Sequence, residues 1–230
     1  MGNISDDDGG GFYTMKLGQP VLEKNIFAGN WTRGGGVGAI RLSKEGRARI
    51  RENIIVNNPG GGVSSVDSYM ELVDNVVMNN TAASGVAYSN LFSYMQPSIV
   101  RGNIIRENEK GAFTVKINAG PDPVFEKNNV DDQSINQGSQ NYNRAIKFEN
   151  DRITGEISQI IFDPLNVKSR IKSSTALEGN EDIIGRIIKI GDRWGVISAY
   201  NDNIITAWGD LYVSENQEMF FEILPSYTQQ

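Results

Sequence analysis

The feature that most constrains this chain is an internal repeat. A pattern of apolar-x-x-Asn-x-apolar-x-x-Asn occurs four times in full, and a fifth copy carries Gln133 at its last position. Such self-similarity is typical of solenoids, in which each unit buries its apolar face against the next. The copies recur at intervals of 28, 22, 28 and 25 residues, and their first asparagines are Asn25, Asn53, Asn75, Asn103 and Asn128.

A second marker keeps step with the asparagines. It is a glycine followed by an apolar or small residue, and it recurs at intervals of 25, 26, 23 and 26 residues. Two markers that agree over five copies predict stacked coils, with each glycine supplying a positive φ before a strand. The coils are expected to begin near Gly11, Gly36, Gly62, Gly85 and Gly111.

Residue type decides between two solenoid classes that share this period. Leucine-rich repeats require a Leu-x-x-Leu-x-Leu stripe and a helical return in every copy, and neither is present. β-Branched residues punctuated by Gly and Asn favour short strands joined by tight turns. Asparagine tolerates the left-handed conformation at a bend, and stacked amides can pair at the ~4.8 Å spacing of neighbouring strands. We therefore predict that the five leading asparagines form one ladder.

The stretch from about residue 3 to 135 resembles the right-handed parallel β-helix superfamily, which includes pectate-lyase-like enzymes, tailspikes and surface adhesins. The resemblance implies an all-β fold with a right-handed parallel β-helix of about five coils. The same coil motif serves many activities, so it specifies function poorly.

The remaining sequence predicts a second domain. We assign residues 1–150 to the β-helix, with a capping strand near 143–148, residues 151–181 to a linker or capping segment, and residues 182–230 to a small SH3-like β-barrel. Trp194 and Trp208 are predicted to lie in the core of that barrel. Its strands are expected at residues 183–190, 193–200, 204–208 and 219–224.

The start of the chain resembles the interior of a coil. Asn3 precedes Gly11 by 8 residues, much as Asn53 precedes Gly62 by 9. We expect further coils upstream in a longer protein, because solenoids normally cover their end coils with a cap.

Composition argues against several classes of function. The formal net charge of −6 disfavours nucleic acid as a partner, because phosphate binding needs an excess of Lys and Arg. Histidine and cysteine are both absent, which removes the commonest general base and the commonest zinc ligands. No apolar run is long enough to span a membrane and no signal-peptide pattern opens the sequence, so we expect no membrane insertion.

Catalytic motifs of related enzymes are not matched. Pectin hydrolases of this superfamily carry paired Asp residues, a Gly-His-Gly and an Arg-Ile-Lys. Arg170-Ile171-Lys172 is present, but it lies outside the coils and no histidine accompanies it, so we interpret it as coincidence. The acidic clusters Asp6-Asp7-Asp8 and Asp131-Asp132 fall in predicted turns, where solvated carboxylates are favoured over a calcium site. No catalytic residue and no cofactor are predicted; calcium is the weaker alternative.

Two sets of polar residues are candidates for ligand binding. In each copy, the residue four places past the apolar residue that follows the glycine should point outward. This column is an ordinary solvated face or a glycan-binding stripe with a nearby aromatic ring. A second set, Arg47, Arg49 and Arg51, is a solvated strand face or an attractor of an acidic polymer, and interstrand ion pairs are expected for Glu23 with Arg51 and Arg101 with Glu126. The first set comprises Lys16, Arg41, Asp67, Asn90 and Lys116, with Tyr88 as the aromatic residue.

These features predict a non-catalytic, extracellular or cell-surface β-helix segment that binds polysaccharide or serves as a surface stalk or adhesin. The alternative is a fragment of a polysaccharide lyase or glycoside hydrolase whose active coils lie partly upstream. A third possibility is a scaffold that binds protein partners through the terminal barrel.

Overall fold

The computed structural model contains almost exclusively β-strands and divides into two compact units, formed essentially by residues 3–146 and 147–228. Each unit is considered by itself. The structure describes residues 1–34, 37–90, 96–131, 134, 136–145, 152–174, 176–177, 183–213 and 219–225.

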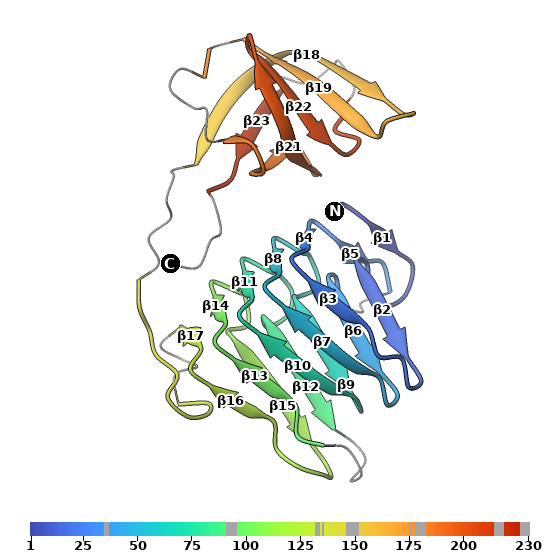
Figure 1. Cartoon of the computed structure of the whole chain (residues 1–230), viewed down its shortest axis with the longest axis vertical. Helices are drawn as coiled ribbons and strands as arrows, with labels where there is room; N and C mark the ends of the chain where they lie inside the picture. The colour runs from blue at the N-terminus through green and yellow to red at the C-terminus, as the bar shows by residue number, and fades with distance from the viewer. Residues whose placement is uncertain are drawn as a thin grey trace. The chain divides into compact units, whose positions relative to one another are not determined.

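The first unit is a parallel β-helix of three sheets with five strands each (Figure 1). The first sheet contains β2 (Phe12–Met15), β6 (Ile40–Ser43), β9 (Val63–Val66), β12 (Val86–Asn90) and β15 (Phe113–Ile117). The second contains β3 (Val21–Glu23), β7 (Arg47–Arg51), β10 (Tyr69–Val73), β13 (Ile99–Arg101) and β16 (Val124–Glu126). The third contains β4 (Ile26–Ala28), β8 (Ile54–Val56), β11 (Val76–Met78), β14 (Ile104–Arg106) and β17 (Asn129–Val130), and a short pair joins β1 (Ile4–Ser5) to β5 (Trp31–Thr32).

The apolar positions of the repeat stack in register inside the coils. In the second sheet, Leu22 pairs with Ile50, Ile50 with Leu72, Leu72 with Val100, and Val100 with Phe125. Three of these, Ile50, Leu72 and Val100, have no exposed surface, and all five pack into one core cluster. Burial of this continuous apolar column along the axis is the main source of stability for a solenoid.

The predicted asparagine ladder is confirmed. The Nδ2 of Asn53 donates to the Oδ1 of Asn75 at 2.9 Å, and Asn75 donates in the same way to Asn103 at 3.0 Å. This ladder runs from Asn25 to Asn128 and is extended by Asn141. A second, parallel ladder is formed by Asn3, Asn30, Asn58, Asn80 and Asn108. Gln133, the last position of the fifth copy, lies outside the described residues.

We expected the ladder asparagine to adopt the left-handed conformation in each turn. The left-handed residue is instead the one before it. Lys24, Glu52, Asp74 and Lys127 have φ between 53° and 55°. The following asparagine stabilises this turn, because its Nδ2 donates to the carbonyl two residues earlier, as Asn53 does to Arg51 at 2.9 Å. An ordinary side chain can therefore occupy a position that would otherwise favour glycine.

Three of the five marker glycines serve close packing rather than positive φ. Gly11, Gly62 and Gly85 are not among the residues with positive φ, but a Cβ on Gly62 would lie 2.5 Å from the carbonyl oxygen of Gly85. Gly111, which does have a positive φ of 81°, lies one residue before the register position taken by Ala112. Gly36 lies outside the described residues, and Ala39 occupies the equivalent position before β6.

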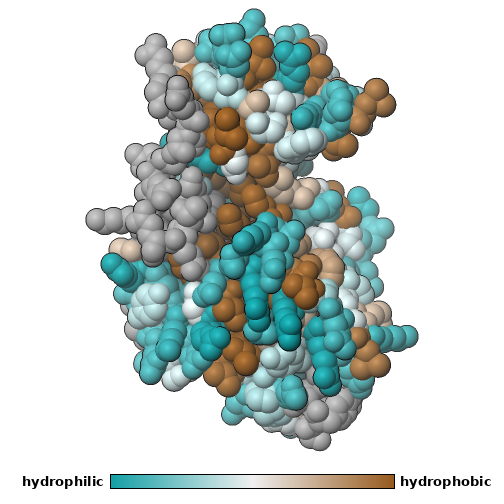
Figure 2. Space-filling view, viewed as in Figure 1, coloured by the Kyte–Doolittle hydropathy of each residue, from teal (hydrophilic) through white to brown (hydrophobic). Residues whose placement is uncertain are grey.

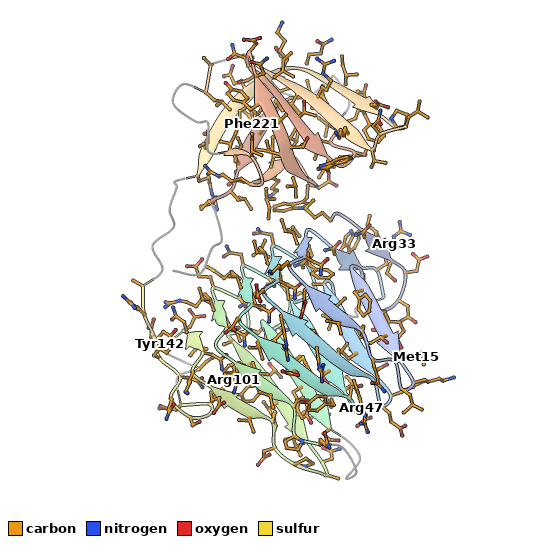
Figure 3. The ribbon with its side chains drawn as sticks, in the orientation of Figure 1. Met15, Arg33, Arg47, Arg101, Tyr142 and Phe221 are labelled. Carbon is orange, nitrogen blue, oxygen red and sulfur yellow. The ribbon has the colours of Figure 1, made fainter. Side chains whose placement is uncertain are left out.

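The second unit is a closed antiparallel barrel of six strands, with Phe221 in its core (Figure 3). Residues 151–181, predicted to be a linker or cap, supply its first two strands, and that prediction is wrong. Trp208 is 48% exposed, so its predicted place in the core is also wrong. The capping strand predicted near residues 143–148 is not observed at residues 143–145, which form no strand. Residues 146–148 lie outside the described residues. The six strands are β18 (Ile153–Asp163), β19 (Lys168–Ser173), β20 (Ile187–Ile190), β21 (Arg193–Asn201), β22 (Ile204–Trp208) and β23 (Phe220–Ile223).

Candidate functional site

The outer face of the second sheet carries the strongest candidate site. Strand β7 has the sequence Arg-Ala-Arg-Ile-Arg, in which Ala48 and Ile50 are buried, so the three arginines point outward. Strand β10 alternates in the same way, because Met70 and Leu72 are buried and Tyr69 and Glu71 face outward. Arg47 and Arg101 extend from β7 and β13 on this face (Figure 3).

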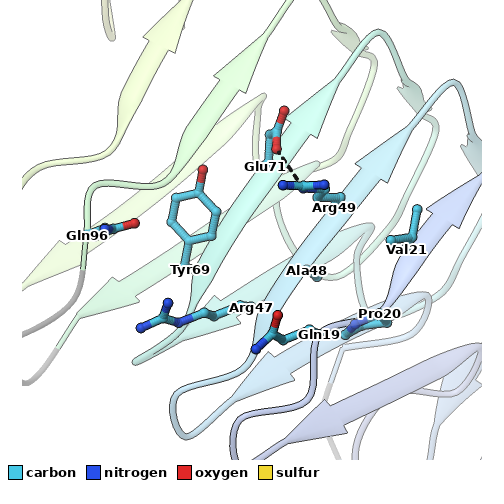
Figure 4. Close-up of a pocket in the computed structure, with 9 residues that line it drawn as sticks. All are labelled: Gln19, Pro20, Val21, Arg47, Ala48, Arg49, Tyr69, Glu71 and Gln96. Atoms are coloured by element: carbon cyan, nitrogen blue, oxygen red, sulfur yellow. Dashed lines mark ion pairs between the residues drawn. The ribbon is translucent and has the colours of Figure 1, made fainter.

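A groove of about 390 Å³ crosses this face above β3, β7 and β10 (Figure 4). Its size falls within the range of small-ligand sites, ~300–1,000 Å³. Hydrophilic side chains gather over much of this side of the β-helix (Figure 2). The lining residues with functional groups are Gln19, Arg47, Arg49, Tyr69, Glu71 and Gln96.

Positive charge exceeds negative charge in the groove. Glu71 forms ion pairs with Arg49, at 3.5 Å between Oε2 and Nε, and with Arg51. Arg47 pairs with Tyr69 in the strand register, and within the described residues no carboxylate lies within ion-pair distance of its guanidinium. The groove therefore offers an exposed cation beside an aromatic ring.

The expected ion pairs on this face are confirmed in part. Arg101 and Glu126 are register partners, and their side chains lie 3.6 Å apart. Glu23 is the register partner of Arg51, as expected, but the carboxylate bound by Arg51 is that of Glu71. Glu71 reaches two arginines of the preceding coil because its register partner is Arg49, and Arg51 is the next outward-facing residue along β7.

The predicted polar stripe on the first sheet does not form a single exposed column. Tyr88 is 2% exposed and Asn90 is fully buried, and burial raises the pKa of the Tyr88 phenol. Arg41 is in register with Tyr13, which lies three residues before Lys16. Lys116 is in register with Ser89, which lies one residue before Asn90. Neither residue therefore aligns with the other members of the predicted stripe. The stripe fails because β6 begins at Ile40 and β15 at Phe113, so the glycine marker misjudges the register of these two coils.

The remaining members of that set separate by exposure. Lys16 and Lys116 are exposed, whereas Asp67 is 7% exposed. Arg41 is half-buried and forms an ion pair with Asp8 at 3.5 Å. The set therefore does not supply one continuous ligand-binding surface.

The acidic clusters are engaged by arginines. Asp6 binds Arg33 at 2.7 Å, and Asp131 binds Arg106 at 3.5 Å. Among the residues that the structure describes, no three carboxylates gather closely enough to hold a metal ion; Asp132 is outside this set. The described chain also contains no helix with the length and apolarity needed to cross a bilayer.

Sequence reasoning missed four residues of the groove: Gln19, Tyr69, Glu71 and Gln96. A signal for two of them was present, because Tyr69-Met-Glu-Leu-Val alternates as Arg47-Ala-Arg-Ile-Arg does, 22 residues earlier. Gln19 and Gln96 precede strands in irregular segments, where no repeat places them.

Comparison with protein families supports the architecture. Residues 2–94 match the family model described as the right handed beta helix region. The coils continue beyond that match to Val130. Neither the curated proteins nor the solved structures contain a match to this chain.

Proposed function

We propose that the right-handed parallel β-helix of this chain binds an acidic polysaccharide, without cleaving it, in the groove above β3, β7 and β10. The observation that carries this proposal is the pairing of the exposed Arg47 with the half-buried ring of Tyr69 in the lining of a groove of about 390 Å³. A guanidinium recognises a carboxylate through charge-assisted hydrogen bonds. An aromatic ring offers an apolar face to a sugar ring.

The amide side chains at the rim suit a hydroxyl-rich ligand. Gln19 and Gln96 are both exposed and line the groove. Gln19 precedes β3 and Gln96 precedes β13, the strands on either side of β7 and β10 in the sheet. Each amide both donates and accepts hydrogen bonds, which matches the mixed character of sugar hydroxyls. Arg49 and Glu71 fix one another by their ion pair, so this part of the groove is preorganised.

The charge pattern favours binding over cleavage. Among the described residues that line the groove, Glu71 is the one carboxylate, and it is held by two arginines. Hydrolysis of a glycoside usually requires two carboxylates, ~5–9.5 Å apart. A lyase or hydrolase fragment remains the competing function, and it predicts product formation.

The rigid coil supports a role as a surface stalk in addition to binding. The first asparagine ladder crosses all five coils and the second runs from Asn3 to Asn108, and their buried members leave the axis little freedom to bend. Polysaccharide binding and a stalk role are both consistent with an extracellular or cell-surface location, which we include in the proposal.

The test is binding to a panel of acidic and neutral polysaccharides by affinity electrophoresis. Acidic polymers should retard the protein, and Arg47→Ala or Tyr69→Ala should weaken binding about tenfold, equivalent to ~1.4 kcal/mol. Arg33→Ala is the matched control, because it removes an exposed arginine that lies outside the groove. Equal affinity of the Arg47 and Arg33 variants refutes the site, and release of reducing ends or unsaturated products establishes the competing enzyme.

A further inference from the structure

The barrel carries a second groove of about 610 Å³ above β18 and β19. A β-bulge in β18, between Ile157 and Gln159, creates its polar floor. Ile157 and Ile160 are both 8% exposed, whereas Ser158 and Gln159 between them are exposed. The bulge thus turns two consecutive polar side chains to the outside, which is how bulges re-aim residues beside functional sites.

The residues around this floor combine charge, hydrogen-bonding groups and an aromatic ring. Gln159 lies opposite Lys172 of β19 in the strand register. Tyr212 is 44% exposed and Ile161 is 51% exposed, and both line the groove with Met219. This set is the usual one for a saccharide site, in which an aromatic ring contacts the sugar and a few polar groups fix its orientation.

Positive charge continues from the groove along β19. Lys168, Arg170 and Lys172 point outward, because Ser169 and Ile171 between them are fully buried. None of the three cations forms an ion pair within the described part of the chain. Successive cations are separated by two residues, or ~6.8 Å of strand, so they form a row suited to a linear polyanion.

Two neighbours modify this row. The ammonium of Lys168 lies 4.0 Å from the centre of the Trp208 ring, which holds it at the surface. Asp163 is the register partner of Lys168 and offsets its charge. The surplus positive charge therefore lies at Arg170 and Lys172, next to the groove.

We propose that the barrel groove is a second binding site, for an acidic saccharide whose carboxylate is held by Lys172 and whose sugar ring packs on Tyr212. The ligand class rests on the proposed function of the β-helix, whereas the residues and the site are independent of it. Arg170 and Lys168 then contact further acidic units of the same polymer. Two linked sites on one chain raise avidity for a long polymer over that for a short oligomer.

The test is an NMR titration of the full chain with a short oligogalacturonate, which reports on each groove separately. The amides of Gln159, Lys172 and Tyr212 should shift, and Lys172→Ala or Tyr212→Ala should weaken this response at least tenfold. Lys189→Ala is the control, because Lys189 lies on β20 against Trp194 and outside the groove. A neutral oligosaccharide of equal length should leave these amides unmoved.

The possible outcomes separate the two proposals. Shifts at Arg47 and Tyr69 without shifts in the barrel overturn this inference and leave the proposed function intact. Shifts in the barrel alone support the inference and refute the β-helix groove. A response to the neutral oligosaccharide that equals the acidic one overturns the assignment of an acidic ligand, and a silent spectrum overturns both sites.

Discussion

Replacement of Asn75 by alanine should destabilise the β-helix more than almost any other polar substitution. Asn75 is fully buried in the middle of the ladder. Its Oδ1 accepts from the backbone N–H and the Nδ2 of Asn53, both at 2.9 Å. Its Nδ2 donates to the carbonyls of Ile50 and Val73 and to the Oδ1 of Asn103, at 2.9, 2.9 and 3.0 Å.

The expected loss follows from these bonds. The two N–H groups of Nδ2 are shared among three acceptors, so the side chain makes the equivalent of about four full hydrogen bonds. At ~0.5–1.5 kcal/mol each these give roughly 2–6 kcal/mol, and the buried N–H of Asn53 keeps no acceptor in place of the lost one. A typical domain is stable by only ~5–15 kcal/mol, so Asn75→Ala should leave the helix close to unfolding. Since each coil contacts only its neighbours, the damage should centre on the coils of β7, β10 and β13.

Hydrogen exchange followed by mass spectrometry measures this effect by segment. Peptides from residues 47–78 should lose protection, while barrel peptides from 187–208 serve as an internal reference. Asn25→Ala is the matched control, because Asn25 is exposed and, within the described part of the chain, its side chain donates only to Glu23 and Asn53. A loss below ~1 kcal/mol for Asn75→Ala, or one no larger than for Asn25→Ala, refutes the view that the ladder stabilises the fold.

Three further substitutions test packing and titration. Gly62→Ala should cost ~1–3 kcal/mol in urea unfolding, because its Cβ would meet the carbonyl oxygen of Gly85 at 2.5 Å, while Gly46→Ala should cost less, since its Cβ would meet no atom closer than 3.6 Å. Tyr88→Phe should reduce the loss of stability above about pH 10: burial raises the folded pKa of Tyr88, so the unfolded state ionises first and stability falls as pH rises toward the folded pKa. Hydrogen bonds from Asn166 lower the pKa of Asp163 in the folded protein, so its contribution to barrel stability is present above about pH 4 and is lost as pH falls through the folded pKa. Asp163→Asn should therefore make the melting temperature of the barrel less sensitive to acid, and an unchanged acid profile contradicts this.

The coil architecture was predictable because its determinants are local and repeated. A ladder asparagine must recur once per coil, so Asn25, Asn53 and Asn75 reveal the coil even when turn lengths vary between 22 and 28 residues. The exact turn geometry was not predictable. The left-handed residues, such as Lys24 and Glu52, differ in type from coil to coil because the asparagine that follows, rather than the residue itself, stabilises the turn.

The site was less predictable because it depends on register between coils. The alternation around Arg47 shows which side chains point outward, but not which residue of the next coil lies beside them. The glycine marker gave the wrong register for Arg41 and Lys116, since the segments before β6 and β15 are longer than the marker implies. In the barrel, the bulge at Ser158 interrupts the alternation of β18, which is why the sequence suggested a linker there.

The ladder and the groove are physically connected, and this connection is testable. Asn53 and Asn75 hold the turns that follow β7 and β10, the two strands that carry Arg47, Arg49, Tyr69 and Glu71. A broken rung there should loosen the register of these side chains although no ladder residue lines the groove.

Asn80→Ala supplies the comparison, because Asn80 is equally buried and makes the same contacts with Asn58 and Asn108 in the second ladder, after β11 of the third sheet. At a temperature where both variants remain folded, Asn75→Ala should weaken binding of an acidic polysaccharide several-fold more than Asn80→Ala. If the two variants lose affinity equally, the groove depends on overall stability alone. If only the Asn75 variant loses affinity, the ladder positions the groove as well as stabilising the coil.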